Sequence, residues 1–117
     1  MSLDLKQIAG LILCDPDMDQ PLRVLRNGEI TLGRAQDNDL TLAHQTVSAH
    51  HAKIYTYLTA SYIEDLNSTN GTFINGKRVS KHVLKADDVI RLGAYALVLK
   101  EPAQLMETVA EESRAAG

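Results

Sequence analysis

The sequence predicts an all-β sandwich, and three observations favour that fold class. Short apolar stretches recur along the 117-residue chain at intervals of about 8–12 residues. Gly, Asn, Asp and Pro gather between these stretches, and tight turns prefer these residues. Within several stretches, apolar and polar residues alternate as they do in a strand that buries one face. The length is sufficient for one compact domain with a single hydrophobic core.

Eight segments have the composition of strands, and turn residues separate most of them. We expect 52–57 to pair with 61–65, and 89–92 to form a closing hairpin with 95–99 around Gly93-Ala94. Turns are also predicted at Asn27-Gly28 and Asn75-Gly76. The eight predicted strands are residues 8–14, 22–25, 29–32, 52–57, 61–65, 73–74, 89–92 and 95–99.

The domain is predicted to cover residues 8–100. Residues 1–7 are interpreted as an N-terminal arm or as added residues, and residues 101–117 as an acidic tail. In that tail Leu105, Met106 and Val109 fall at helical spacing, which predicts a short helix. A disordered acidic linker is the alternative.

Charge and cysteine content narrow the function classes. Residues 1–20 and 101–117 each carry a net charge of −3, whereas residues 21–100 carry +3. A mildly basic centre suits a small anionic ligand better than a nucleic acid. No apolar run is long enough for a membrane span, and no signal peptide is visible. Cys14 is the only cysteine, so we expect no internal disulfide, and a cytoplasmic location.

Three polar clusters lie where predicted strands give way to loops. They are residues 33–39, residues 48–51, and residues 65–72 with Asn75-Gly76. The loops of a sandwich gather at its two ends, and loops on a rigid scaffold commonly carry recognition. If the three clusters share one end, they bring together a guanidinium, hydroxyls, a carboxamide and backbone N–H groups.

This set of donors suits a phosphate dianion. The guanidinium of Arg34 presents a planar fork of N–H groups that matches phosphate oxygens. Ser48 and Thr69 add hydroxyl donors, and Asn70 adds an amide donor. Each charge-assisted hydrogen bond contributes about 1.5–3 kcal/mol. One arginine with a few neutral donors therefore predicts modest affinity, to which neighbouring peptide contacts must add.

The order and spacing of these residues resemble the signature of the forkhead-associated (FHA) family. The resemblance covers about Ile8 to Leu99, and it implies an FHA-like sandwich of about eleven mostly antiparallel strands. It further implies that loops at one end bind phosphothreonine peptides, and that the domain is not an enzyme. The residues that carry it are Gly33-Arg34, Ser48 and His51 as Ser-x-x-His, Ser68-Thr69-Asn70-Gly71-Thr72, and Asn75-Gly76.

The resemblance also implies roles for single residues. Phosphopeptide contacts fall to Arg34, Ser48, Thr69 and Asn70. Structural support of the site falls to Gly33, His51, Gly71, Asn75 and Gly76. Lys77 and Arg78 are secondary candidates for contact with the peptide, with a solvated loop face as the alternative. No cofactor or metal is implied.

Three positions depart from the family pattern. Ala49 stands after the signature serine, where Arg, Lys or Asn is common, so one contact to phosphate or peptide is missing. Thr46 stands at a position that is basic in some members, so strong selection for an acidic peptide residue is not expected. Asp87 stands where glycine is frequent, which bears only on a turn.

The expected partner is a phosphothreonine-containing protein, a serine/threonine kinase or a kinase substrate, and neither a nucleic acid nor a membrane. Ala49 and Thr46 leave a second hypothesis open, in which the same scaffold is a phosphate-independent interaction or assembly module. Exposed strand edges would give such a module a route to β-pairing.

Other interpretations of the same residues are weaker. Arg34 could be a structural arginine paired with Asp37 or Asp39. Hydrolysis would need an activated serine, and no Gly-x-Ser-x-Gly element is present. A zinc site would need paired ligand spacing, which is absent. The hydrolase residues would be Ser48, His51 and Asp65; the zinc ligands would come from His44, His50, His51 and Cys14. The tyrosines at 55, 57, 62 and 95 are interpreted as strand core or cross-strand pairs.

Overall fold

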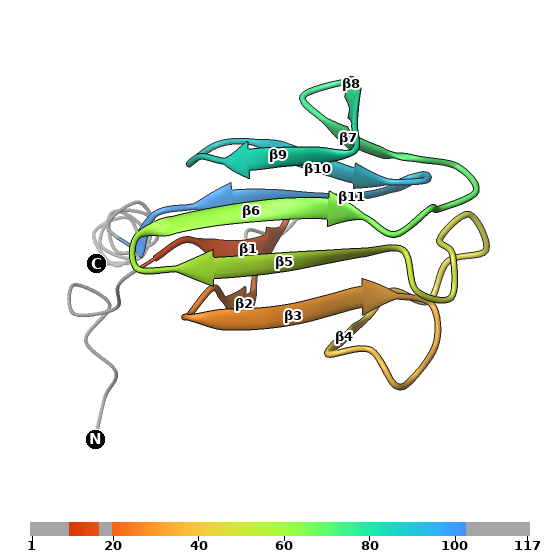
Figure 1. Ribbon diagram of the computed structural model, residues 1–117, viewed down its shortest axis with the longest axis horizontal. Coiled ribbons are helices and arrows are strands. Elements are labelled where there is room, and N and C mark those ends of the chain that lie inside the picture. The colour runs from red at the N-terminus through yellow and green to blue at the C-terminus, as the bar shows by residue number, and fades with distance from the viewer. Residues whose placement is uncertain (1–9, 17–19, 103–117) are drawn as a thin grey trace, which may run out of the picture.

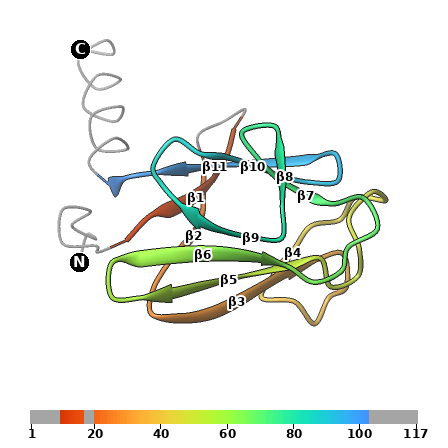
Figure 2. The ribbon, with the colours of Figure 1, turned by 45° about the horizontal axis from the view of Figure 1, so that its top comes forward.

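Two β-sheets face one another in the computed structural model, which describes residues 10–16 and 20–102 (Figures 1 and 2). The six-stranded sheet has the order β2 (Gln20–Val24), β1 (Ile12–Asp15), β11 (Tyr95–Lys100), β10 (Val89–Leu92), β7 (Thr72–Ile74) and β8 (Lys77–Val79). The five-stranded sheet has the order β4 (Leu40–Thr41), β3 (Gly28–Gly33), β5 (Ala52–Tyr57), β6 (Ala60–Asp65) and β9 (Lys81–Leu84). The paired strands are antiparallel except β3 and β4, which are parallel. The predicted all-β sandwich is confirmed.

Alternating side chains build the core between the sheets. Strand β5 buries Ala52, Ile54 and Thr56, while the residues between them turn outward. Burial of one large aliphatic side chain contributes about 1.5–3 kcal/mol, so the inner faces hold the sandwich together. The main buried cluster contains Leu13, Leu25, Leu32, Leu42, Val47, Ala52, Ile54, Ile63, Ile74, Leu84, Ile90, Leu92, Leu97 and Leu99.

The predicted strand pairs are confirmed, and three strands were not predicted. Residues 52–57 pair with β6, and residues 89–92 pair with β11, as expected. Strands β4, β8 and β9 lack the apolar alternation that predicts a strand, because they are short or carry Lys, Arg and His on exposed positions. The rings of Tyr55 and Tyr62 form a cross-strand pair with centroids 6.1 Å apart.

Some of the sequence-based predictions fall on residues that the structure does not describe. The first predicted strand began at residue 8, and within the described range β1 begins at Ile12. The predicted helix of the acidic tail falls on residues 103–117, which are not described. The domain boundaries at 8 and 100 therefore stay predictions. No helix among residues 10–16 and 20–102 is long and apolar enough to cross a membrane.

The direction of the strands brings the polar clusters to one end of the sandwich, on the right in Figure 1. Strand β3 ends at Gly33, β5 begins at Ala52, and β6 ends at Asp65. Strand β7 begins at Thr72 on the facing sheet, and the turn at 93–94 joins β10 to β11. The first loop (34–39), the second loop (42–51) and the third loop (66–71) therefore meet beside that turn, which is the arrangement that the site prediction required.

Candidate functional site

Arg34 follows directly after β3 and is fixed to the loop that precedes β5. Its backbone N–H donates to the carbonyl oxygen of Ser48 at 3.0 Å. Its side-chain Nε donates to the carbonyl oxygen of Val47, also at 3.0 Å. The side chain is exposed. Because Nε is engaged and the residue is exposed, the two terminal nitrogens of the guanidinium can bind an anion as a fork.

The interpretation of Arg34 as a structural ion-pair residue is wrong. The carboxylate of Asp37 lies 2.9 Å from Nε2 of His50, and that of Asp39 accepts from the backbone N–H of Thr31 at 2.8 Å. The hydrogen bond from His50 lowers the pKa of Asp37. No salt bridge joins Arg34 to a carboxylate within the described part of the chain.

Ser48 joins the second polar cluster to the third. Its Oγ accepts the backbone N–H of Thr69 at 3.0 Å, so the hydroxyl proton stays available to a ligand. The Thr69 side chain is exposed on the neighbouring loop. Arg34 is thus bonded to the segment 47–48, and Ser48 to Thr69, so the three residues lie around one region of the surface.

His51 is fully buried beneath these residues and bridges two loops. Its Nδ1 lies 3.0 Å from the backbone N of Ser48, which can only donate. Its Nε2 lies 2.9 Å from the carbonyl oxygen of Gly71, which can only accept. The ring is therefore neutral with its proton on Nε2. This arrangement matches the supporting role that the family resemblance implies for His51.

Asp65 holds the third loop in shape. Its carboxylate accepts the backbone N–H of Ser68 at 3.1 Å, the hydroxyl of Ser68, and the hydroxyl of Thr72 at 2.7 Å. The Ser68 oxygen accepts in turn from the backbone N–H of Gly71 at 3.0 Å. Burial acts to raise the pKa of Asp65, but the hydrogen bonds from Ser68 and Thr72 outweigh it and the pKa is lowered.

The geometry of Ser48, His51 and Asp65 differs from that of a hydrolytic triad. Both ring nitrogens of His51 bond to backbone groups, and Ser48 Oγ bonds to the Thr69 backbone instead of the ring. The Asp65 carboxylate lies 4.0 Å from Nε2 of His51 and bonds to its own loop. The histidine is therefore not placed to take a proton from the serine.

Asn70 connects the third loop to residues 44–46. Its Nδ2 donates to the carbonyl oxygen of Thr46 at 2.8 Å, and the side chain is exposed. The hydroxyl of Thr46 accepts the backbone N–H of Ala94 at 2.8 Å and lies 2.7 Å from Nδ1 of His44. The amide oxygen of Asn70 and its second N–H group can therefore contact a ligand beside Thr69.

Gly33 and Asn38 set the distance between the first two loops. A Cβ at Gly33 would collide with the backbone carbonyl of Ala49, so only glycine allows this close approach. The buried amide of Asn38 donates to the carbonyl oxygens of Ala35 and Ala49, each at 2.7 Å. Asn38 belongs to the first polar cluster, but its position in the sequence gives no sign of this role.

Asn75 and Gly76 form the two-residue turn between β7 and β8, where both have positive φ angles. Strand β7 leads away from the loop 66–71, so this turn lies farther from Arg34 than Gly71 does. The side chain of Asn75 bonds to Asp88 and to the backbone of Val89, which fixes the hairpin to β10. These residues support the sheet, and through it the start of β7.

Arg78 and Lys77 have different places on β8. Arg78 pairs with Phe73, and its guanidinium lies against Gly71, at the edge of the third loop. Lys77 pairs with Ile74, next to the turn, and so lies farther along the hairpin. Of the two secondary candidates, Arg78 is the one that lies near the convergence of the loops.

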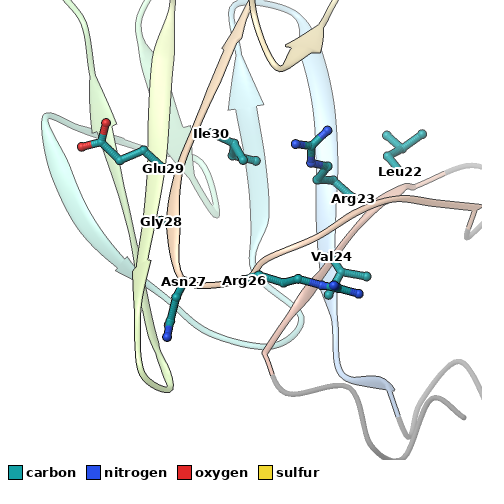
Figure 3. A pocket seen from close by; sticks show the side chains of 8 residues that line it. All are labelled: Leu22, Arg23, Val24, Arg26, Asn27, Gly28, Glu29 and Ile30. Carbon is teal, nitrogen blue, oxygen red and sulfur yellow. The ribbon is translucent and has the colours of Figure 1, made fainter.

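One other feature lies apart from this convergence. A shallow pocket opens between β2 and β3 at the opposite end of the sandwich, where Arg23 and Arg26 are among its lining residues (Figure 3). Among the residues that the structure describes, no group of three or more His, Cys, Asp or Glu side chains could hold a metal ion.

Comparison with known proteins agrees with this geometry. Residues 30–93, more than half of the chain, match the model of the FHA domain. The chain belongs to the FHA domain family. It is 35% identical over 89 residues to the ABC transporter ATP-binding/permease protein Rv1747 of Mycobacterium tuberculosis, and 38% identical over 76 residues to the FHA domain-containing protein FhaA of the same organism. These matches cover 68% and 65% of this chain, but only 10% and 14% of the two relatives.

Solved FHA domain structures share the whole fold. A structure from a study of phosphothreonine-dependent FHA domain interactions has a TM-score of 0.72 and 34% identity, and the match covers 77% of this chain and 94% of that one. The FhaA FHA domain complexed with the intracellular domain of Rv3910 has a TM-score of 0.68 and 36% identity, with coverage of 77% and 97%. FHA domains are interaction modules, so the family agrees with a binding site instead of a catalytic one.

Proposed function

We propose that this FHA domain binds phosphothreonine in a partner protein through Arg34, Ser48, Thr69 and Asn70. The phosphate would accept from the terminal nitrogens of Arg34 and from the hydroxyls of Ser48 and Thr69. Asn70 would hold the backbone of the peptide. Gly33, His51 and Gly71 keep these donors in place, and Asn75-Gly76 anchors the adjoining hairpin.

The proposal rests on the charge of Arg34, which no carboxylate of the described residues pairs, and on neighbouring donors that hydrogen bonds already fix. The Nε of Arg34 is hydrogen-bonded to the carbonyl oxygen of Val47, the residue is exposed, and the Ser48 hydroxyl still has a proton to donate. Donors that are held in place before binding lose little conformational entropy when the ligand arrives. A phosphate with two negative charges gains more from such a site than a neutral hydroxyl does.

Related structures support the same ligand class. EmbR of Mycobacterium tuberculosis, solved in complex with a low affinity phosphopeptide, is 31% identical with a TM-score of 0.70. The proposed partner is therefore a phosphothreonine-containing protein, either a serine/threonine kinase or one of its substrates. A cytoplasmic setting belongs to the same proposal, because ATP-dependent protein kinases act there.

A phosphopeptide library, measured beside its unphosphorylated and phosphoserine copies, tests the proposal. We expect phosphothreonine peptides to bind more than tenfold more tightly than their unphosphorylated copies, a difference of about 1.4 kcal/mol. Phosphoserine copies should bind more weakly than phosphothreonine copies. A preference for phosphate below tenfold would favour the second hypothesis, a phosphate-independent interaction module on the same scaffold.

A further inference from the structure

Three residues form a row on the outer face of the six-stranded sheet, beside the proposed site. Arg78 on β8, Phe73 on β7 and Arg91 on β10 are register partners on adjacent strands. Directly opposed residues of antiparallel strands point to the same face of the sheet. The two arginines are exposed and Phe73 is partly buried, so the row lies on the outer face. We name these three residues the basic row.

Contacts hold both arginines of the basic row near the loop that carries Thr69 and Asn70. The guanidinium carbon of Arg91 lies 5.7 Å from the centre of the Phe73 ring, within the range of a cation–π interaction. The Nε of Arg78 is close enough to Gly71 that a Cβ there would lie 3.0 Å from it. The row is therefore continuous with the third loop of the site.

A shallow pocket of about 420 Å³ joins the basic row to the proposed phosphate site. Asn70 lines this pocket, and Asn70 is also one of the four proposed peptide contacts. A peptide held by Asn70 would therefore pass the mouth of the pocket. The lining residues are Thr46, Asn70, Phe73, Arg91, Gly93 and Ala94.

The only formally charged residue that lines this pocket is Arg91. In the described ranges no salt bridge joins Arg91 or Arg78 to a carboxylate. The hydroxyl of Thr46 is already engaged by the Ala94 backbone and by His44. An anionic side chain that enters the pocket would thus meet a positive charge that no carboxylate of the described residues neutralises.

We propose that Arg91, supported by Arg78, selects peptides that carry a second anionic group near the phosphothreonine. The group is the carboxylate of Asp or Glu, or a second phosphate, since a guanidinium binds either one. This inference rests on the proposed function. It also differs from the expectation drawn from Thr46, because the positive charge comes from β10 and β8 instead of position 46.

The test is an anion scan of a phosphothreonine peptide by calorimetry. The background peptide has alanine at four positions on each side of the phosphothreonine, and Asp is placed at each position in turn. We expect one position to raise the affinity about two- to fivefold, the range of an exposed ion pair. A second phosphothreonine at that position should raise the affinity further, because its charge is close to −2.

Variants assign that gain to the basic row. Arg91→Ala should remove the gain from Asp while leaving the affinity for the all-alanine peptide within about twofold, and Arg91→Lys should keep part of it. Arg78→Ala should reduce the gain. Arg23→Ala, which removes a charge at the opposite end of the sandwich, should leave the gain unchanged.

Two results would overturn the inference in different ways. If phosphate-dependent binding is present but the Asp scan is flat, or the gain survives in Arg91→Ala, the inference fails and the proposed function stands. If the phosphopeptide binds no better than its unphosphorylated copy, the proposed function fails and takes the inference with it.

Discussion

The two ends of the sandwich both carry exposed arginines beside a shallow pocket of similar size, and they differ in how the loops are connected. At the distal end, a pocket of about 430 Å³ is lined by Arg23 and Arg26, with neighbouring residues of β2 and β3 (Figure 3). Between described residues, no side-chain hydrogen bond ties the Arg26 turn to another loop. At the binding end, Ser48 and His51 tie the loops together by side-chain bonds.

This difference indicates that positive charge and a hollow do not by themselves make a phosphate site. A phosphate is strongly hydrated, and protein donors replace its water well only when they are already in position. At the binding end, buried groups supply that order, and the exposed residues are the proposed contacts. Changing the buried groups and the exposed residues separately therefore tests this comparison.

The largest effect on binding is expected from Arg34→Ala, which removes the only charged side chain that we propose to contact the phosphate. We expect phosphopeptide affinity to fall at least about 100-fold, or about 2.7 kcal/mol, because two charge-assisted hydrogen bonds are lost. Thermal unfolding should change little, because the side chain is exposed. Arg23→Ala at the distal end should leave affinity unchanged. Calorimetry that finds equal affinity for both variants would reject the assigned site.

His51→Ala should act on stability first. It leaves a void in a fully buried position and removes the partners of the Ser48 N–H and the Gly71 carbonyl. We expect the free energy of unfolding to fall by about 3 kcal/mol. His82→Ala, on an exposed position of β9, should change it by less than about 0.5 kcal/mol. Denaturant unfolding measures both variants. If their unfolding curves coincide, His51 does not brace the loops.

Asp65→Asn should weaken the third loop in a pH-dependent way. The pKa of Asp65 is lowered in the fold, so its stabilising contribution is complete above its ordinary value of 3.8 and is lost as the pH falls through the folded value. At pH 7 we expect the variant to be less stable by about 2 kcal/mol, the cost of lost bonds to a charged acceptor. The difference should narrow below pH 3.8. Urea melts from pH 7 to pH 3 measure it, and a constant difference would contradict the assignment.

Most of the strands that the sequence predicts bury at least one face. Ala52–Tyr57 alternates strictly, and its bounds match the prediction. The short edge strand β8 could not be predicted, because an exposed Lys-Arg-Val stretch has no apolar alternation and forms a strand only by pairing with β7. Its pairing depends on a neighbour in the fold, and not on its own pattern.

The candidate site divides in a similar way. The donors that face solvent belong to residue types that bind phosphate, so their chemistry could be predicted from Arg34, Ser48 and Asn70. The residues that hold the loops in place were harder to predict. Asn38, for example, bonds to backbone carbonyls that only the fold brings near. The exception is Asp65, since an aspartate three residues before a serine commonly accepts its backbone N–H. That local signal could have identified Asp65 as the residue whose carboxylate holds the third loop.

The smallest expected effect is a gain from Ala49→Arg, which places a second guanidinium beside Ser48. Ala49 is exposed, and its role in the fold comes from its backbone carbonyl, so the substitution should not disturb the braces. We expect phosphopeptide affinity to rise about three- to fivefold, the range of one exposed ion pair. Thr59→Arg adds the same charge at the exposed distal turn and controls for general attraction. An equal gain in both variants would mean that net charge, and not the position beside Ser48, attracts the phosphate.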